Sequence, residues 1–404
     1  MSRPISPATA VSPLVRYLPI LDWLPRYRRT DLAGDLLAGL IVAIMLVPQG
    51  MSYALLAGLP PQVGLYASII PLVMYGVLGT SRTLAVGPVA IVSLMVASGI
   101  GGMNAGGAEL LQLAVTLAVM VGLLQAVMGV LRIGFLVNFL SHPVLVGFTA
   151  AAAIIIGFSQ VKHLLGFSVP RAEYFYEQVV YTVEHLGQTN LTTLAIGLGA
   201  VGVLLYFKMG ISAQLRRWGV RPGWVVPVSK SAPLIIVLLG TLLVWGFNLT
   251  ETAGINIVGD VPAGLPPLSL PSMDPTVWRA LLPPALTISF VGYMESISVA
   301  KSFASKRRQK VGANQELIAL GAANLGAAFT GGYPVTGGFS RSVVNFAAGA
   351  NTGLASIVTA VLVTITVIFL TPLFYFLPNA VLGAIVLVAV TGLVDVKNIR
   401  HIWH

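Results

Sequence analysis

The sequence contains no cysteine and very little charge, and each absence excludes a class of protein. Without cysteine there are no disulfide bonds and no thiolate metal sites. Only 9% of the 404 residues are charged, whereas a soluble domain carries about 25%. Hydrophobic residues make up 56% of the chain, and the mean hydropathy is +0.89. We therefore predict an all-α polytopic membrane protein and not a soluble domain.

Signatures of enzymes and cofactor sites are also missing. The sequence has neither the His-Glu-x-x-His pattern of zinc peptidases nor the Gly-x-Ser-x-Gly pattern of serine hydrolases. Its glycine-rich stretch at 331–338 lacks the Gly-Lys-Ser/Thr that completes a phosphate loop. The net charge of +10 is explained in a membrane protein by basic cytoplasmic loops. We expect no catalytic residue, metal, cofactor or nucleic-acid partner.

Long apolar runs fill most of the chain and predict ten full membrane spans. The spans are Leu36–Ala57, Gln62–Leu78, Leu110–Val130, His142–Leu165, Leu191–Phe207, Ala232–Asn248, Leu281–Ala300, Glu316–Thr330, Thr352–Leu370 and Pro378–Val394. The first is expected to be interrupted in its middle at Pro48-Gln49-Gly50. Residues 1–30 form a polar tail before it.

Two further apolar segments, numbers 3 and 10 in the chain, are too short to cross a bilayer as helices. Thr83–Pro88 leads into an apolar run that ends at Ser98, and Thr330–Gly338 leads into Phe339–Ala350. Such runs make about 16–18 Å of helix, roughly half of a 30 Å hydrocarbon core. Irregular backbone at this depth needs burial in protein or a wet cavity. We predict two half-helices that meet at the midplane, with their positive N-termini around an anion.

The distribution of charge supports this arrangement. With the N-terminus in the cytoplasm, 19 of the 23 lysines and arginines fall on the cytoplasmic side and three outside. Such an excess is what the positive-inside rule expects. Arg341 is the one base left at membrane depth, and Glu295 is the one acid. Ionisable groups at that depth are functional candidates by default.

Arg341 and Ser340 open the second half-helix and are the first candidates for an anion site. A guanidinium, a hydroxyl and the free N–H groups of a helix N-terminus all donate to anions. A structural ion pair between Arg341 and Glu295 is the alternative. Val86, Gly87, Pro88 and Phe339 flank the two half-helix N-termini and are included in the predicted substrate site.

Three other residues complete the prediction. Gln49 and Tyr53 lie four apart on the first span, hence on one helix face, where an amide and an aromatic edge can reach the site; core packing is the alternative for Tyr53. Glu295 is the candidate coupling residue. Burial favours the neutral form of a carboxyl group, so a proton bound there would remove repulsion of an arriving anion. Sodium held by Glu295 and carbonyl groups is the alternative.

Several ordered motifs resemble the SulP sulfate-permease family, whose animal members are the anion exchangers of solute-carrier family twenty-six. The match runs from about residue 30 to the C-terminus. The matching motifs are Val47-Pro48-Gln49-Gly50-Met51-Ser52-Tyr53-Ala54, Gly58-Leu59-Pro60-Pro61, Gly64-Leu65-Tyr66, Gly79-Thr80-Ser81-Arg82, Glu295-Ser296-Ile297-Ser298, Asn314-Gln315-Glu316-Leu317, Gly321, Asn324 and 331–342.

The resemblance implies two inverted seven-segment repeats that form a core and a gate, and transport by elevator-like movement of core against gate. Core segments would occupy 31–131 and 281–371, and gate segments 132–280 and 372–404. The family pattern continues with two more gate segments and a cytoplasmic STAS domain, which the sequence as given does not contain. The resemblance also implies a homodimer for the full-length form.

The sequence therefore predicts a secondary transporter of a small inorganic or organic anion, of the sulfate, bicarbonate or dicarboxylate class. We expect proton-coupled symport, in the inner membrane of a bacterium and in contact with its lipids. Sodium-coupled symport and anion exchange stay open as alternatives. So do a nucleobase permease of the sister family and an anion channel or sensor.

Overall fold

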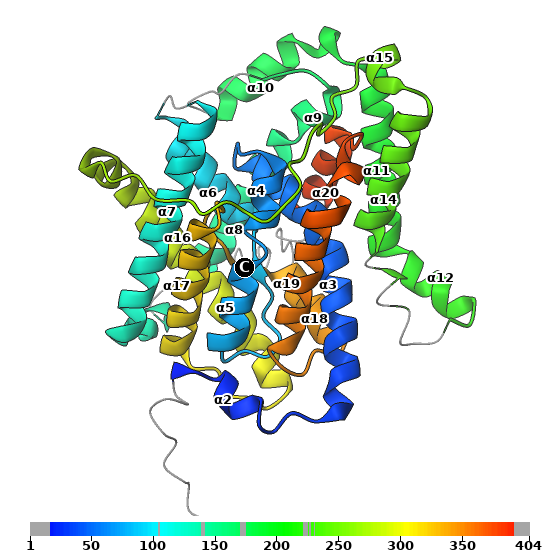
Figure 1. The fold of residues 1–404 in the computed structure, drawn as a ribbon. Coiled ribbons are helices and arrows are strands. Elements are labelled where there is room, and N and C mark those ends of the chain that lie inside the picture. Colours follow the sequence, from blue (N-terminus) through cyan, green and yellow to red (C-terminus); the bar gives the residue numbers. More distant parts are fainter. Residues whose placement is uncertain are drawn as a thin grey trace, which may run out of the picture.

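A computed structural model of the chain describes residues 17–391, except 104–105, 139–141, 170–174, 221–224, 226–227 and 230. The first 16 residues of the predicted tail and the part of the last predicted gate segment beyond residue 391 lie outside this range. Figure 1 shows a bundle of helices, with α9, α10 and α15 at one end and α2 at the other. The helices α11 and α14 run along one side of the view, and α7, α16 and α17 lie on the other.

The elements of the described chain are almost all helical. In order they are α2 (Ile20–Trp23), α3 (Arg29–Leu56), α4 (Pro61–Tyr66), α5 (Ile70–Leu78), β1 (Val86–Gly87), α6 (Ala90–Gly101), α7 (Gly107–Val130), η1 (Ile133–Asn138), α8 (His142–Ser159), α9 (Val161–Leu165), α10 (Phe175–Glu184), η2 (Leu186–Gln188), α11 (Leu191–Met209), α12 (Ile211–Arg217), α14 (Ala232–Gly246), α15 (Leu249–Ala253), α16 (Pro275–Lys306), α17 (Ala313–Phe329), β2 (Thr336–Gly337), α18 (Phe339–Ala347), α19 (Leu354–Ile365), η3 (Thr366–Leu370), η4 (Thr371–Phe374) and α20 (Asn379–Val390).

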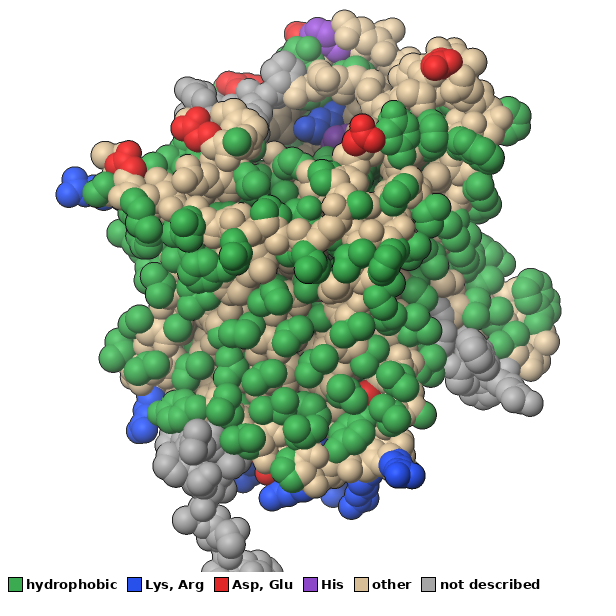
Figure 2. Space-filling model, in the orientation of Figure 1, with side chains coloured by type: hydrophobic (Ala, Val, Ile, Leu, Met, Phe, Trp, Pro, Cys, Tyr) green, Lys and Arg blue, Asp and Glu red, His purple; other side chains and the backbone are tan. Residues whose placement is uncertain are grey.

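The surface is that of a membrane protein. Six stretches of helix among the described residues are long and apolar enough to cross a bilayer. They are α3, α4 with α5, α7, α11, α16, and α19 with the turns that follow it. In Figure 2 a band of hydrophobic side chains lies between acidic side chains at the end near α10 and α15 and basic ones at the end near α2. Such a band is what a hydrocarbon layer requires.

Two predicted spans differ from expectation. The interruption predicted at Pro48 is wrong, because α3 runs through it without a break. Proline is tolerated in membrane helices where neighbouring helices pack around it, and this part of α3 is buried. The predicted single helix at 62–78 is divided into α4 and α5, which starts with Pro71 in its first turn.

The two predicted half-helices are present, and their extended lead-ins pair with each other. β1 and β2 are antiparallel, with Val86 opposite Gly337 and Gly87 opposite Thr336. The short helix α6 starts three residues after β1, and α18 starts two residues after β2. Segments 250 residues apart in sequence are thus joined where both half-helices begin, so the two N-termini lie near each other.

Buried apolar side chains form two main clusters around this crossing. The larger takes in residues of α6, α7, α16 and α17, such as Val96, Leu117, Ile288 and Leu320. The second joins α3, α5 and α19 to α11, α14 and α20. The paired strands lie inside the first cluster, to which Val86 and Val335 belong. The polar lead-ins are therefore held within a packed apolar interior.

Close packing of α7 against α17 depends on two glycines. A Cβ added at Gly321 would lie 2.7 Å from the Ala126 nitrogen and 2.8 Å from the Gly122 carbonyl oxygen. Both neighbours are backbone atoms, which cannot move aside without separating the helices. Small residues commonly allow such close approach between membrane helices.

Gly321→Ala is expected to lower the thermal stability of the detergent-solubilised protein, by about 1–3 kcal/mol as for other overpacked sites. The matched control is Gly199→Ala on α11, where an added Cβ meets no atom within 4 Å. Melting curves of both variants test the claim. An equal or higher melting temperature for Gly321→Ala than for Gly199→Ala would contradict it.

Candidate functional site: a cavity at the two half-helix N-termini

Asn324 of α17 holds the lead-in of α18 in place. Its side-chain oxygen accepts from the Val335 nitrogen at 2.8 Å, and its amide nitrogen donates to the Val335 carbonyl at 3.1 Å. The same amide nitrogen donates to the Gln125 side chain of α7 at 3.0 Å. Asn324 is fully buried, so these bonds satisfy backbone groups that water cannot reach. The Asn324 side chain thereby pairs with both backbone polar groups of Val335, as a neighbouring β-strand would.

Ser296 of α16 fixes β2 from another side. Its hydroxyl accepts from the Gly337 nitrogen at 2.8 Å and lies 2.7 Å from the Thr336 hydroxyl. Thr336 in turn donates to the Gly292 carbonyl at 2.6 Å. Because the Thr336 proton is used there, the Ser296 hydroxyl donates to Thr336. Every polar group of this buried cluster thus has a partner.

The lead-in of α6 is tied directly to α18. The Ser342 hydroxyl accepts from the Ala85 nitrogen at 2.9 Å, and the Asn345 side chain donates to the Thr83 carbonyl at 3.1 Å. The Gly338 nitrogen donates to the Ala85 carbonyl at 3.0 Å. These hydrogen bonds therefore fix the position of the α6 N-terminus relative to that of α18.

Arg341 lies in the first turn of α18, and most of its donors are unused. Its side chain is 2% exposed. One terminal nitrogen, Nη1, donates to the Pro88 carbonyl at 2.7 Å, but Nε and Nη2 have no partner among the described residues. A guanidinium has five N–H donors, and burying them unpaired is costly. Such a group is suited to receive an anion.

Gly87 allows this approach of Arg341 to β1. Its φ of +151° is rarely adopted by other residues. A Cβ there would also lie 3.3 Å from Nη2 of Arg341. Glycine is therefore required both for the backbone conformation and for the space beside the guanidinium.

Glu295 of α16 is the second unpaired charge of the site. Its Oε2 atom is buried and has no hydrogen-bond partner within the described part of the chain. The ion pair between Arg26 and Asp22 at 2.9 Å is the only one among the described residues. The alternative interpretation, a permanent ion pair between Arg341 and Glu295, is therefore not what the structure contains.

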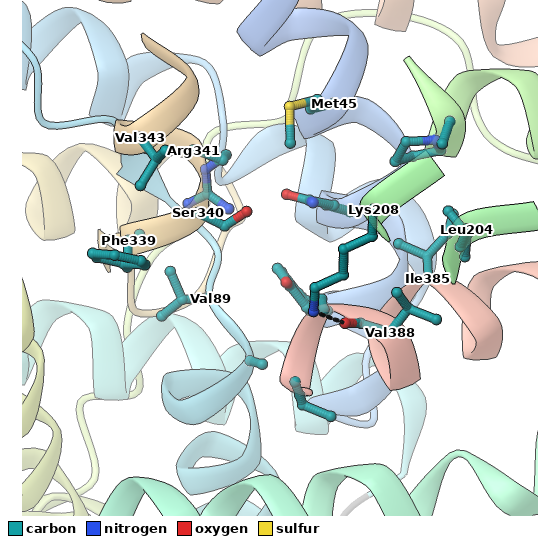
Figure 3. A pocket seen from close by; sticks show the side chains of 18 of the residues that line it. Met45, Val89, Leu204, Lys208, Phe339, Ser340, Arg341, Val343, Ile385 and Val388 are labelled. Atoms are coloured by element: carbon teal, nitrogen blue, oxygen red, sulfur yellow. Dashed lines mark hydrogen bonds between the residues drawn. The ribbon is translucent and has the colours of Figure 1, made fainter. Parts of the chain in front are cut away.

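A cavity of about 290 Å³ lies in front of these residues. Figure 3 shows Phe339, Ser340 and Arg341 on one side of it and Leu204, Lys208 and Ile385 on the other. Six predicted site residues line it: Gln49, Tyr53, Glu295, Phe339, Ser340 and Arg341. The other three, Val86, Gly87 and Pro88, are not among its lining residues. Pro88 lies behind, where its carbonyl holds Arg341, and Val89, Ala90 and Ile91 line the wall instead.

The opposite wall was not found from the sequence. It is formed by residues of α11, by the start of α14 and the residues before it, and by α20: Leu204, Phe207, Lys208, Ser229, Ala232, Pro233, Ile385, Val388, Ala389 and Val390. These residues look like ordinary apolar spans in the sequence. Lys208, at the end of such a span, is the one signal that could have identified this wall.

Both half-helices present uncapped N-termini at the cavity. The residues before the first turns are Val89 for α6 and Gly338 for α18, and neither makes a side-chain cap. The first N–H groups of a helix have no partner within the helix, and the helix dipole makes this end positive. Ser340 is exposed to the cavity beside them. The chemistry of the site favours an anion with several hydrogen-bond acceptors.

A family comparison agrees with this chemistry. The model of the family described as "Sulfate permease family" matches residues 32–404. The chain belongs to the sulfate permease family. Membership of this transporter family shows that the chain is not an enzyme.

Relatives of known name extend the comparison. The chain is similar to the chloroplastic sulfate transporter 4.1 of Arabidopsis thaliana, with 40% identity over 388 residues. The aligned region is 95% of this chain but only 55% of the plant protein, so the chain spans about half the length of that relative.

Solved structures show the same fold. The murine solute carrier 26 family member A9 anion transporter, in the inward-facing state, has a TM-score of 0.89 and 27% identity over all of this chain and 67% of its own. The transmembrane domain of a cyanobacterium bicarbonate transporter, BicA, has a TM-score of 0.80 and 22% identity over 93% of this chain and 92% of its own. The chain therefore has the inverted-repeat fold of these membrane domains. Relatives from a plant, a mouse and a cyanobacterium do not single out a bacterial source.

Ser296→Ala is expected to lower thermal stability by about 1–3 kcal/mol, because the buried Gly337 N–H would lose its acceptor. Ser298→Ala is the matched control, since Ser298 lies two residues further along the same helix and is exposed. Thermal melting of both variants in the same detergent tests this role. If Ser296→Ala were no less stable than Ser298→Ala, Ser296 would not hold β2.

Proposed function

We propose that the chain is the membrane part of a secondary transporter that moves a small anion, with sulfate as the first candidate. The observation that carries the proposal is Arg341, a buried guanidinium with two nitrogen atoms unpaired, beside a cavity and two helix N-termini. Each of these three features favours an oxyanion. The printed names of relatives, a sulfate transporter and a bicarbonate transporter, support the same class.

In this proposal the anion lies in the cavity in front of α18. Nη2 and Nε of Arg341 donate to it, together with the Ser340 hydroxyl and the first N–H groups of α6 and α18. Gln49 and Tyr53 of α3 contribute from the side. The cavity has polar groups mainly on this wall, so the anion is bound from one side and is open to water on the other.

Transport then follows from movement of one group of helices past another. The polar contacts that build the site come from α6, α7, α16, α17 and α18, which we assign with α3, α4, α5 and α19 to a core. We assign α8, α9, α11, α14 and α20 to a gate. An apolar cluster joins the two, with Tyr53 and Ile91 packed against Ile156 of α8 and Val386 of α20. Apolar surfaces can slide without breaking hydrogen bonds, which supports an elevator-like movement.

The cavity in this structure is proposed to face the cytoplasm. Its gate wall includes Phe207 and Lys208 at the end of α11 and Ala232 at the start of α14. Those ends flank the basic loop 208–230, which the positive-inside rule assigns to the cytoplasm. The N-terminus is then cytoplasmic as well. We propose the inner membrane of a bacterium as the location and, for the full-length form, a homodimer.

Glu295 is the proposed coupling group. Its buried Oε2 has no partner, and an unpaired carboxylate in an apolar interior is costly. Binding a proton removes that cost and also the repulsion between Glu295 and an arriving anion. The proton is then carried with the anion when the core moves. Sodium coupling is the alternative that the uptake test below distinguishes from proton coupling.

Arg341→Gln is expected to reduce uptake of labelled sulfate into proteoliposomes by about tenfold or more, the scale of a charge-assisted hydrogen bond. Arg341→Lys keeps the charge but loses the planar fork, so intermediate uptake is expected. Arg216→Gln, on the exposed helix α12, is the control for loss of one positive charge. Unchanged uptake by Arg341→Gln would contradict the proposed site. Bicarbonate and a dicarboxylate, tested in parallel, identify the preferred anion.

Glu295→Gln is expected to abolish the response of uptake to an inward proton gradient, because an amide does not take up or release a proton in this pH range. In the unaltered protein an inward gradient is expected to raise the initial rate, whereas a sodium gradient has no effect. Glu109→Gln, at the exposed start of α7, is the control. Proton-stimulated uptake by Glu295→Gln would remove the coupling role from Glu295, and stimulation by sodium alone would favour sodium symport. Flux that does not saturate would favour a channel.

A further inference from the structure

A second cavity, of about 390 Å³, lies between α6, α8 and α16, and we call it the lateral crevice. The helix α6 packs against both α8 and α16. Ile91 and Gly99 of α6, Ala152 of α8 and Pro284 of α16 are among the residues that line the crevice. Its volume is within the range of sites that hold small molecules. Ile91 also lines the anion cavity, so the two cavities adjoin at the first turn of α6.

The lining of the lateral crevice is apolar. Among the described residues that line it, none is charged, and only Ser98 and Thr287 have polar side chains. The Thr287 hydroxyl already donates to the Pro283 carbonyl of its own helix at 3.0 Å. A buried water needs two to four polar partners, and apolar cavities without them stay dry. An empty cavity also forfeits dispersion contacts along its walls. The lateral crevice is therefore suited to an apolar ligand.

The crevice is closed toward the interior of the protein and open at its surface. Ile91 is only 2% exposed, and Ala152 is buried as well. Ile155, one turn further along α8, is 37% exposed, and Ala151 beside it is also exposed. A molecule that reaches the crevice therefore enters past Ala151 and Ile155.

The surface around this opening is apolar too. Ile154 of α8 is 62% exposed, and Leu282 and Leu286 of α16 are also exposed. Both helices belong to the membrane part of the chain, where exposed side chains of this kind face the hydrocarbon of the bilayer. The crevice therefore opens to lipid chains and not to water.

The crevice follows α6 for most of the length of that helix. Gly99 is eight positions after Ile91, which corresponds to about 12 Å of helix. The helix α6 starts at the β1–β2 crossing, which the sequence predicts at the midplane, and one half of the hydrocarbon core is about 15 Å deep. The crevice thus extends from the level of the midplane toward one membrane surface, as a lipid chain in that leaflet does.

We propose that the lateral crevice binds one acyl chain of a membrane phospholipid. A chain that enters from the bilayer leaves one apolar environment for another, so packing against the walls decides whether it stays. The chain would lie between α8, which we assign to the gate, and α6 and α16, which we assign to the core. It would contact Ile91 on the side opposite the anion cavity. This inference does not depend on which anion, if any, the protein carries.

Labelling with a photoreactive lipid tests the proposal in proteoliposomes. The probe is a phosphatidylcholine with a diazirine in one acyl chain, which on illumination loses nitrogen and inserts into a neighbouring bond. Mass spectrometry of the peptides identifies the labelled residues. We expect label on Met95, which lines the crevice and is only partly exposed. Leu239 of α14 is exposed and does not line the crevice, so its label serves as the reference for ordinary lipid contact.

Ala151→Trp places an indole at the opening of the crevice. The label on Met95 is expected to fall about fivefold or more relative to that on Leu239, because the indole and the lipid chain compete for one volume. Ile154→Trp is the matched control, since Ile154 lies on the same helix and is exposed but does not line the crevice. It should leave the label on Met95 unchanged.

A second variant separates occupancy of the crevice from folding. The chain has no cysteine, so Ala151→Cys provides a single thiol that can be modified in the purified, folded protein. A decyl methanethiosulfonate attaches a chain that fills the crevice, whereas a methyl methanethiosulfonate leaves it open. We expect the decyl form to lose the label on Met95 and the methyl form to keep it.

Each outcome decides the proposal. Label on Met95 that both the indole and the decyl chain remove supports a bound acyl chain. Label on Leu239 without label on Met95 in the unaltered protein overturns it, and so does label on Met95 that the decyl chain does not reduce. None of these measurements requires transport. Failure of the proposed anion transport would therefore leave this inference standing, and failure of the labelling would leave the proposed function intact.

Discussion

The pairing of β1 with β2 is the contact on which the rest of the structure depends. Two residues of each lead-in form it, with Val86 opposite Gly337 and Gly87 opposite Thr336. Backbone at this depth has no water to bind, so the remaining groups of the lead-ins are satisfied by side chains such as Asn324 and Ser296. Each of these side chains is supplied by a helix of the larger apolar cluster. A short sheet, held from several sides, thereby fixes where both half-helices begin.

The pairing of β1 with β2 also places the Arg341 guanidinium where no acidic side chain of the described residues forms an ion pair with it. Arg341 is held by the Pro88 carbonyl, and Gly87 leaves room beside its guanidinium. Glu295, the acidic residue that lines the same cavity, makes no ion pair with Arg341 in the described structure. Two buried ionisable groups that each have unpaired polar atoms lower stability, and proteins retain such groups where a ligand or a proton satisfies those atoms. The cost of the site is offset by the packed interior around it, where α7 and α17 meet at Gly122 and Gly321.

One wall of the cavity contains residues that the sequence predicted for the site, because these residues carry chemical signals. Arg341 and Glu295 are unusual at membrane depth, and the lead-ins at 83–88 and 330–338 are unusual in composition, so both half-helices were predicted close to their observed bounds. The break between α4 and α5 and the continuity of α3 through Pro48 depend on packing by neighbouring helices, which a local pattern does not contain. The opposite wall of the cavity was missed for the same reason. Leu204, Ile385 and Val388 are ordinary apolar residues, and only the folded chain brings them opposite Ser340.

We propose that an anion binds between the two half-helix N-termini and Arg341. Selenate, which has the shape and charge of sulfate and a strong anomalous signal, tests it most directly in a structure of the protein determined with that anion. One selenate is expected in the cavity, within hydrogen-bond distance of Nη2 of Arg341 and of the first N–H groups of α18. Selenate bound elsewhere, with this cavity containing only water at a saturating selenate concentration, would rule out this binding site.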